Sequence, residues 1–262
     1  MLRRVKDLRG YTIAASDGDI GRIDDVYFDD QSWTVRHVVV DTGTWLTGRR
    51  VLIPPRAIDG MDASRERVTT RLTRKQVEDS PGVDTEQPVS RQHERHLYGY
   101  YGYPFYWGGP YLWGPIPYPA APPPDAYAVE RAGGDEPAGD THLRSARDVS
   151  GHRIQATDGE LGHVEDYLID EQTWAIRYLI VDPRNWWPGH FVVIATEWIV
   201  AVHWNESTVQ VDVDKETVRK APPYEADRVL DREYERRLHE YFRRPGYWER
   251  GPEAWKRYPP AA

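Results

Sequence analysis

Acidic side chains crowd one short stretch near the N-terminus and are the first residues that could do chemistry. Six aspartates lie within 14 positions, namely Asp17, Asp19, Asp24, Asp25, Asp29 and Asp30. A calcium loop needs oxygen ligands at positions 1, 3 and 5 and a Glu at position 12. Counted from Asp17, position 5 is Gly21 and position 12 is Phe28. The spacing therefore favours turn carboxylates on a solvated rim, with a structural hydrogen bond to backbone as the expected role of Asp25.

Other reactive residue types are scattered or missing. His93 and His96 lie three residues apart and could share a metal ion on one helix face. The chain has no Cys, which removes thiol chemistry, disulfides and Cys-ligated zinc. Neither a phosphate-binding glycine loop nor a nucleophile-elbow serine is present. We therefore expect no catalytic residue, no metal ligand and no cofactor, and an enzyme with an unrecognised acidic site stays the minor alternative.

Aromatic residues form the other unusual set. The chain has 11 Trp and 17 Tyr but only 4 Phe, and ten of these aromatics fall within residues 98–118. The candidate interaction residues are Tyr100, Tyr101, Tyr103, Tyr106, Trp107, Tyr111 and Trp113. Eight prolines between Pro104 and Pro124 forbid a long helix or a central strand here. Three interpretations stay open: a strap across a barrel groove, a site for self-association or a Pro-rich partner, and contact with a membrane interface.

An internal repeat organises the chain. A shift of 141 residues aligns residues 8–41 with residues 149–182 without a gap, and 13 of the 34 pairs are identical. The duplicated positions of greatest structural interest are Gly10, Asp17, Gly18, Gly21, Asp25 and Trp33 in the first copy, and Gly151, Asp158, Gly159, Gly162, Asp166 and Trp174 in the second. A period this long indicates two copies of one domain rather than a solenoid. The metal interpretation weakens, because Tyr234 and Arg237 replace the two histidines.

Each copy reads as a series of short strands separated by Gly/Asp turns. In the first copy we expect strands over residues 11–15, 20–23, 26–28, 33–40, 50–53 and 68–72. The second copy repeats the pattern and ends in the strictly alternating residues 208–213. Short strands with regular turns predict all-β small barrels in tandem.

A short amphipathic helix is expected after each barrel. Val89, His93, Leu97, Tyr100 and Tyr101 fall at i, i+4, i+8, i+11 and i+12, and the second copy keeps this stripe. The duplicated polar residues Arg91, Glu94 and Arg95 are expected to face away from it. Packing of each helix on its own barrel is the first interpretation, and pairing across domains or subunits is the second.

These patterns divide the chain into five parts. They are a barrel over residues 1–80, a helical extension over 81–103, a Pro/Tyr/Trp-rich and partly disordered linker over 104–145, a second barrel over 146–221, and a C-terminal helix and tail over 222–262. The tail, with Trp255 and Tyr258, faintly resembles the aromatic linker.

Charge and hydropathy restrict the partners. The net charge is −8 and the mean hydropathy is −0.74, which argues against nucleic acid as the main partner. Residues 1–80 carry a net charge of +1 and residues 146–221 a net charge of −6, so the two copies present different surfaces. No apolar stretch of seven or more follows the basic N-terminal residues, and no run of 18 apolar residues occurs, so neither a secretory signal nor a spanning helix is expected. The expected compartment is the cytoplasm.

The stretch from Leu8 to Asp29, with Ser16-Asp17-Gly18-Asp19-Ile20-Gly21 at its centre, resembles the PRC-barrel family. Residues 149–170 repeat this pattern, and residues 36–41 and 51–54 also fit it. The resemblance implies a small all-β barrel that docks to other macromolecules rather than catalysing a reaction. Known settings of the family include the cytoplasmic part of the photosynthetic reaction-centre H subunit and a module of a ribosome-maturation factor.

These observations predict a tandem PRC-barrel protein that acts as a non-catalytic adaptor or scaffold. We expect it to dock to other proteins or to self-associate, with a second copy of the chain as one candidate partner. A peripheral membrane or reaction-centre-associated protein, of the electron-transfer-complex type, is the alternative. The identity of the protein partner is not fixed by the sequence.

Overall fold

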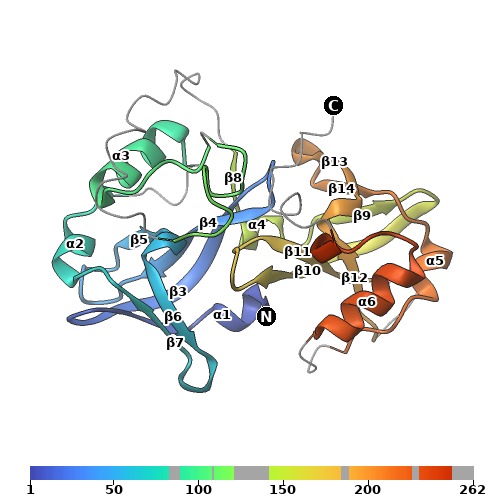
Figure 1. Cartoon of the computed structure of the whole chain (residues 1–262), viewed down its shortest axis with the longest axis horizontal. Coiled ribbons are helices and arrows are strands. Elements are labelled where there is room, and N and C mark those ends of the chain that lie inside the picture. The colour runs from blue at the N-terminus through green and yellow to red at the C-terminus, as the bar shows by residue number, and fades with distance from the viewer. Residues whose placement is uncertain (83–88, 108, 121–141, 184–188, 226–229, 250–262) are drawn as a thin grey trace. The chain divides into compact units, whose positions relative to one another are not determined.

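The computed structural model describes residues 1–82, 89–107, 109–120, 142–183, 189–225 and 230–249 (Figure 1). The chain divides into two compact units. The N-terminal unit is Asp7–Ala146, and the C-terminal unit combines Met1–Lys6 with Arg147–Ala262. Most of the linker that we expect to be disordered, residues 121–141, lies outside the described residues.

The first repeat contributes β1 (Leu2–Arg4), α1 (Val5–Leu8) and the elements up to the helix that follows its barrel. These are β2 (Thr12–Ala15), β3 (Gly18–Asp29), β4 (Thr34–Asp41), β5 (Arg50–Ile53), η1 (Pro55–Ala57), β6 (Ile58–Asp62), η2 (Ala63–Arg65), β7 (Arg67–Thr70), α2 (Arg74–Glu78) and α3 (Arg91–Tyr101). Two expected strands, residues 20–23 and 26–28, are a single long strand, β3. That strand stays continuous because β-bulges absorb its bends between Ile23 and Asp25 and between Tyr27 and Phe28.

The second repeat has the same elements in the same order. They are β8 (Leu143–Ser145), α4 (Ala146–Val149), β9 (Arg153–Ala156), β10 (Gly159–Asp170), β11 (Ile176–Asp182), β12 (Val192–Ala195), η4 (Thr196–Trp198), β13 (Ile199–His203), η5 (Trp204–Glu206), β14 (Thr208–Val211), α5 (Lys215–Arg219) and α6 (Arg232–Tyr241). The bulges of β10 fall at Val164/Asp166 and Leu168/Ile169, one repeat after those of β3.

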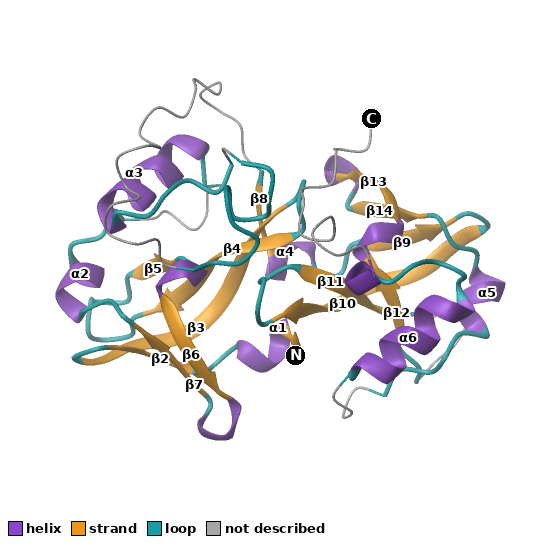
Figure 2. Ribbon diagram, viewed as in Figure 1, coloured by secondary structure: helices purple, strands orange, loops and turns teal. Residues whose placement is uncertain are grey.

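Both sheets have seven strands and the same topology (Figure 2). The N-terminal unit runs β5-β4-β3-β2-β7-β6, and the C-terminal unit runs β12-β11-β10-β9-β14-β13. The β2–β7 and β9–β14 pairs are parallel, and the other pairs are antiparallel. The expected fold class, small all-β barrels in tandem with short helices, is confirmed.

The first strand of each repeat joins the sheet of the other repeat. Strand β1 pairs with β10 in the C-terminal unit, and β8 pairs with β3 in the N-terminal unit. The Arg144 Nε donates to Asp30 Oδ2 at 2.8 Å, and the Lys6 backbone N–H donates to Asp166 Oδ1 at 3.1 Å. The two repeats therefore exchange their first strands within one chain.

Helix α3 packs on the barrel of its own unit. Its Leu97 is fully buried in a cluster with Tyr27, Val39 and Leu52 of the sheet, and Tyr101 packs against this cluster. Arg91 and Glu94 do not face away from this side, contrary to the expectation, because both are buried with 5% and 2% of their surface exposed. Leu97 and these two polar residues thus lie on the buried side of one helix.

The duplicated motif residues keep the same structural roles in both units. Gly21 lies so close to the next strand that a Cβ would meet the Asp41 carbonyl oxygen at 2.1 Å, and at Gly162 the Asp182 oxygen would be at 2.3 Å. Only glycine fits there. The other pairs occupy turns and buried positions of the same kind: Gly10/Gly151 and Gly18/Gly159 have positive φ, and Trp33/Trp174 are buried with positive φ.

Asp17, Asp158 and Asp166 of the motif accept backbone hydrogen bonds, whereas Asp25 accepts from the Ser145 hydroxyl at 2.5 Å. Asp17 Oδ1 accepts from the Arg74 N–H at 2.7 Å at the start of α2, and Asp158 accepts from the Lys215 N–H at 2.9 Å at the start of α5. Asp166 Oδ1 accepts from the Tyr167 N–H at 2.8 Å, as well as from Lys6. The aspartate carboxylates thus stabilise the first turns of helices and nearby backbone by accepting hydrogen bonds from N–H groups.

Candidate interaction site

The acidic cluster near the N-terminus is largely structural. Asp25 and Asp29 are 5% and 2% exposed, so they do not belong to the solvated rim that we expected. Asp29 Oδ1 accepts from the Ser32 N–H at 2.9 Å and from its hydroxyl at 3.0 Å, which closes the turn before β4. Among the described residues, no group of three or more His, Cys, Asp or Glu side chains could hold a metal ion.

A buried polar cluster lies between helix α3 and the sheet of the N-terminal unit. Arg91 donates to Glu94 Oε2 at 3.0 Å and to the Tyr106 hydroxyl at 2.6 Å. The Tyr106 hydroxyl donates to Glu94 Oε1 at 2.8 Å, and His37 Nε2 lies 3.2 Å from the same oxygen. Burial raises the pKa of the Tyr106 hydroxyl well above its usual value. Helix α3, strand β4 and the aromatic segment therefore meet at the Glu94 carboxylate, through Arg91, His37 and Tyr106.

The segment that follows, residues 109–120, is called the strap here. It has no helix, and two isolated bridges, Tyr111 with Gly114 and Trp113 with Ile116, make it a tight double turn. Arg36 donates to the Leu112 carbonyl at 2.6 Å. Arg56 donates to the Trp113 carbonyl at 2.5 Å and to the Ala120 carbonyl at 2.9 Å.

Contacts between arginine guanidinium groups and aromatic rings also hold the strap in place. The Trp113 ring is fully buried, and the guanidinium groups of Arg36 and Arg56 lie 4.8 and 5.5 Å from its centroid. The Arg36 guanidinium also lies 3.8 Å from the Tyr106 centroid. Buried arginines that donate to backbone carbonyls and stack on aromatic rings recognise the path of a peptide more than its side chains. The strap is therefore held through its own backbone carbonyls, and the site that Arg36, Arg56 and Tyr106 form around it is called the N-terminal groove.

The expected interaction residues divide by exposure. Tyr106 and Trp113 are completely buried and Tyr103 is 8% exposed, so these rings offer a partner no surface in this structure. Trp107, Tyr111 and Tyr101 are partly buried. Tyr100 is 40% exposed, and its hydroxyl donates to the Gln76 carbonyl at 2.8 Å. The interaction role stays a prediction for the rings with exposed surface.

The C-terminal unit repeats the cluster beside α6. Arg232 forms an ion pair with Glu235 at 3.0 Å, and its guanidinium lies 5.0 Å from the Tyr247 ring and 4.4 Å from the Trp248 ring. Arg177 lies 4.0 Å from the Tyr247 ring, as Arg36 does from Tyr106. The same shift of 141 residues relates these residues to Arg91, Glu94, Tyr106, Trp107 and Arg36.

One pair of buried rings is reversed between the copies. His37 on β4 meets Tyr98 on α3 edge to face, with centroids 5.8 Å apart. At the equivalent positions, Tyr178 on β11 meets His239 on α6 at 6.0 Å. The Tyr178 hydroxyl lies 3.0 Å from both Glu235 Oε1 and His239 Nε2. Burial raises the pKa of the Glu235 carboxyl and lowers that of the His239 imidazole, because removal from water disfavours the charged form of each group.

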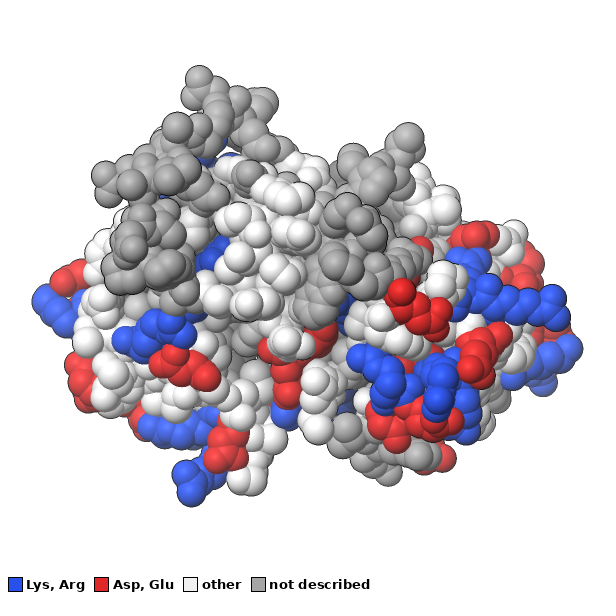
Figure 3. Space-filling model, viewed as in Figure 1, with Lys and Arg blue, Asp and Glu red and all other residues white. Residues whose placement is uncertain are grey.

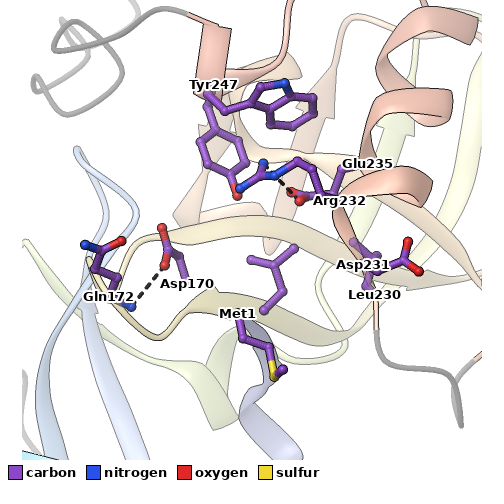
Figure 4. Close-up of a pocket in the computed structure, with 10 residues that line it drawn as sticks. Met1, Asp170, Gln172, Leu230, Asp231, Arg232, Glu235 and Tyr247 are labelled. Atoms are coloured by element: carbon purple, nitrogen blue, oxygen red, sulfur yellow. Dashed lines mark hydrogen bonds and ion pairs between the residues drawn. The ribbon is translucent and has the colours of Figure 1, made fainter.

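A pocket of about 420 Å³ opens beside this cluster in the C-terminal unit. It is lined by Met1, Leu2, Asp170, Gln172, Leu230, Asp231, Arg232, Glu235, Tyr247 and Trp248. Figure 4 shows Arg232 between the Tyr247 ring and Glu235, with Leu230 and Met1 on the opposite side. The pocket thus combines aromatic, charged and aliphatic side chains, which suits an amphipathic ligand.

The sequence alone indicated the strap but not the polar cluster. The identity of Arg91 with Arg232 and of Glu94 with Glu235 was the available signal, since duplicated polar residues on a helix need a common reason. The helical spacing places them away from the stripe, because they fall between its positions. Their partner Tyr106 lies beyond the end of the helix, so the helical pattern could not reveal it.

Surface and membrane features add little to this site. On the face shown in Figure 3, acidic and basic side chains lie side by side and no continuous basic patch is visible. Within the part of the chain that the structure describes, no helix is long and apolar enough to cross a membrane.

Comparison with known families assigns the first repeat. The family model of the PRC-barrel domain matches residues 2–77. No curated protein matches the chain. The matched range includes β1 and ends within α2, so it covers the whole sheet-forming part of the first repeat. Residues 2–77 of this chain are a PRC-barrel domain.

Proposed function

We propose that this chain is a cytoplasmic, non-catalytic adaptor built from tandem PRC barrels, each of which docks a segment of protein beside its long helix. PRC-barrel domains are generally non-catalytic. The strap carries the proposal, because the N-terminal unit already holds a peptide by its backbone carbonyls through Arg36 and Arg56. A groove that binds backbone and aromatic rings can accept segments of varied sequence.

The C-terminal unit supports docking of a second segment. Arg232, Glu235 and Tyr247 line a pocket of about 420 Å³, and the Arg177 guanidinium lies 4.0 Å from the Tyr247 ring. Each groove lies beside the long helix of its own unit, so each unit can hold one segment. Self-association is one form of this activity, in which the docked segment belongs to a second copy.

Capture of partners by the intact chain tests the proposal. Arg232→Ala removes a pocket side chain that is 55% exposed, and Arg236→Ala removes one that is 50% exposed on the same helix but does not line the pocket. We expect quantitative mass spectrometry to show a set of host proteins that Arg232→Ala loses and Arg236→Ala retains, with circular dichroism unchanged in both variants.

Light scattering on the same three proteins covers self-association. A mass above that of the monomer that falls in Arg232→Ala alone would support docking of a second copy. The proposal fails if the chain is a strict monomer and the two variants capture the same proteins as the unaltered chain.

A further inference from the structure

The filled groove of the N-terminal unit and the open pocket of the C-terminal unit are built from the same residues. Tyr106 meets Trp113 of the strap with ring centroids 6.4 Å apart, whereas its counterpart Tyr247 lines the pocket. Arg36 donates to the strap carbonyl of Leu112 at 2.6 Å. Among the described residues, the hydrogen bonds of its counterpart Arg177 are long, at 3.5 Å to Asp170 and 3.4 Å to Thr173.

The sequence after Tyr247 repeats the sequence that fills the first groove. The strap begins Gly109-Pro110-Tyr111-Leu112-Trp113, and the C-terminal segment contains Gly251-Pro252-Glu253-Ala254-Trp255. The shared pattern is Gly-Pro-x-x-Trp. Trp113 follows Tyr106 by seven residues and Trp255 follows Tyr247 by eight, so one inserted residue relates the two segments.

We propose that residues 251–258 of this chain bind in the pocket of the C-terminal unit, with Trp255 taking the place that Trp113 takes in the N-terminal unit. These residues lie outside the described part of the structure. The segment is within reach, because the last described residue, Glu249, directly follows Trp248 in the pocket wall. The inference rests on the proposed function and names the ligand of the second groove.

Charge distinguishes the two ligands and matches each to its own groove. Residues 109–120 carry no charge, and Arg56 holds the Trp113 carbonyl. The position of Arg56 is occupied by Glu197 in the second copy, and Trp255 is followed by Lys256 and Arg257 where Trp113 is followed by Gly114 and Pro115.

The pocket lining has the same bias. Three of its lining side chains are acidic, Asp170, Asp231 and Glu235, and one is basic, Arg232. A cationic aromatic segment therefore suits the C-terminal groove better than the neutral strap would, because opposite charges at close range favour one ligand over another.

Binding of a synthetic peptide tests this placement in the full-length chain. The peptide is residues 249–262 with a fluorescent label, and its affinity is measured by anisotropy for the unaltered chain and for Trp255→Ala. A bound tail blocks the pocket, so we expect Trp255→Ala to bind the peptide at least about tenfold more tightly than the unaltered chain. A peptide with Ala in place of its Trp is the control and should bind neither protein.

A second peptide, residues 109–120, separates this inference from the proposed function. If Trp255→Ala binds the strap peptide but not the tail peptide, the groove docks peptides and the inference is wrong. If neither peptide binds, both the inference and docking at this pocket fail. Equal affinity of the tail peptide for both proteins also overturns the inference.

Cross-linking decides whether the tail and the pocket belong to the same chain. A benzophenone amino acid in place of Trp255 should cross-link to the peptides that contain Leu230–Glu235 or Tyr247–Trp248. In a mixture of unlabelled and ¹⁵N-labelled chain, every cross-linked pair should carry a single isotope composition. Mixed pairs would assign the tail to a second copy and would overturn binding within one chain.

Discussion

The strap fills the N-terminal groove, whereas no segment among the described residues fills the C-terminal pocket, although the two are built from the same arginine, glutamate, tyrosine and tryptophan positions. In the first, three buried arginines, Arg36, Arg56 and Arg91, surround Tyr106 and Trp113. In the second, Arg177 and Arg232 occupy the positions of Arg36 and Arg91, and Glu197 occupies the position of Arg56. The arrangement of these side chains is therefore duplicated, while the charge around it has diverged.

This difference has an energetic consequence. A charged group removed from water must be compensated by hydrogen bonds or by an opposite charge. In the N-terminal unit the strap supplies three carbonyl acceptors to Arg36 and Arg56. The strap is therefore an integral part of the folded unit. Its loss should lower the free energy of unfolding more than any equivalent change in the C-terminal unit does.

The largest effect is expected from Trp113→Ala. The ring is fully buried against two arginines and Tyr106, so its removal leaves a cavity and exposes the groove. We expect the free energy of unfolding of the N-terminal unit to fall by about 3–5 kcal/mol. Thermal unfolding followed by near-ultraviolet circular dichroism measures the loss. Tyr118→Ala, in the same strap but 45% exposed, is the control and should change little; a loss below about 1 kcal/mol for Trp113→Ala would contradict the structural role of the strap.

The next effect compares equivalent arginines. Arg36→Met leaves the Leu112 carbonyl and the Ser32 hydroxyl without their donor, at a cost of about 2–4 kcal/mol. Arg177→Met removes only contacts of 3.4 Å or longer and should cost about 1 kcal/mol. Urea unfolding of both variants measures the difference. Equal losses of unfolding free energy in the two variants would show that the hydrogen bond from Arg36 to the Leu112 carbonyl adds no stability beyond the long contacts of Arg177.

A buried carboxylate adds a pH-dependent difference between the units. Burial raises the pKa of Asp166 from 3.8 to about 6 in the folded chain. The folded state then binds the proton more tightly than the unfolded state, so the free energy of unfolding falls as the pH rises from about 4 to about 6, and stays lower above that. Asp166→Asn keeps an oxygen for the Lys6 and Tyr167 N–H groups without the charge. We expect it to stabilise the chain by about 2 kcal/mol at pH 7 and to have no effect at pH 4.

Asp25 is the matched position in the other unit and should behave differently. Its carboxylate lies 3.6 Å from the Arg9 guanidinium, and the counterpart of Arg9 is Ser150. Asp25→Asn therefore removes an attractive partner and should not stabilise the chain at pH 7. Unfolding measured at both pH values checks the pair, and a gain for Asp25→Asn equal to that for Asp166→Asn would remove the distinction.

The sequence predicted the two sheets but not the exchange of the first strands, β1 and β8, between them. The glycines that let strands approach, such as Gly21 and Gly162, recur at a fixed shift, so the duplicated barrel was predictable. Which sheet Leu2–Arg4 joins was not, because strand pairing uses backbone groups that every residue carries. Both long strands, β3 and β10, offer a nearly equivalent edge.

The site was predictable only in part for a related reason. The aromatic segment was recognisable by composition, and an intramolecular strap was its first interpretation. Its seat depends on side chains far apart in the chain, with Arg36 and Leu112 separated by 76 residues. Burial of Arg91 and Glu94 follows from these distant partners and not from the helical pattern, which favours the solvent side for charged residues.

The smallest expected effect tests the reversed ring pair. In the C-terminal unit, Tyr178→His places two imidazoles side by side near Glu235, and His239→Tyr places two phenols there. The N-terminal unit shows that His on the strand and Tyr on the helix also fit, with His37 Nε2 still 3.2 Å from the carboxylate. The double variant Tyr178→His/His239→Tyr should therefore be more stable than the sum of the two single losses, by a coupling energy of about 1 kcal/mol. Urea unfolding of the four proteins measures that energy. Additive losses would mean that the two buried rings can vary independently, and that the reversal between the copies reflects separate changes and not one exchanged hydrogen-bonded pair.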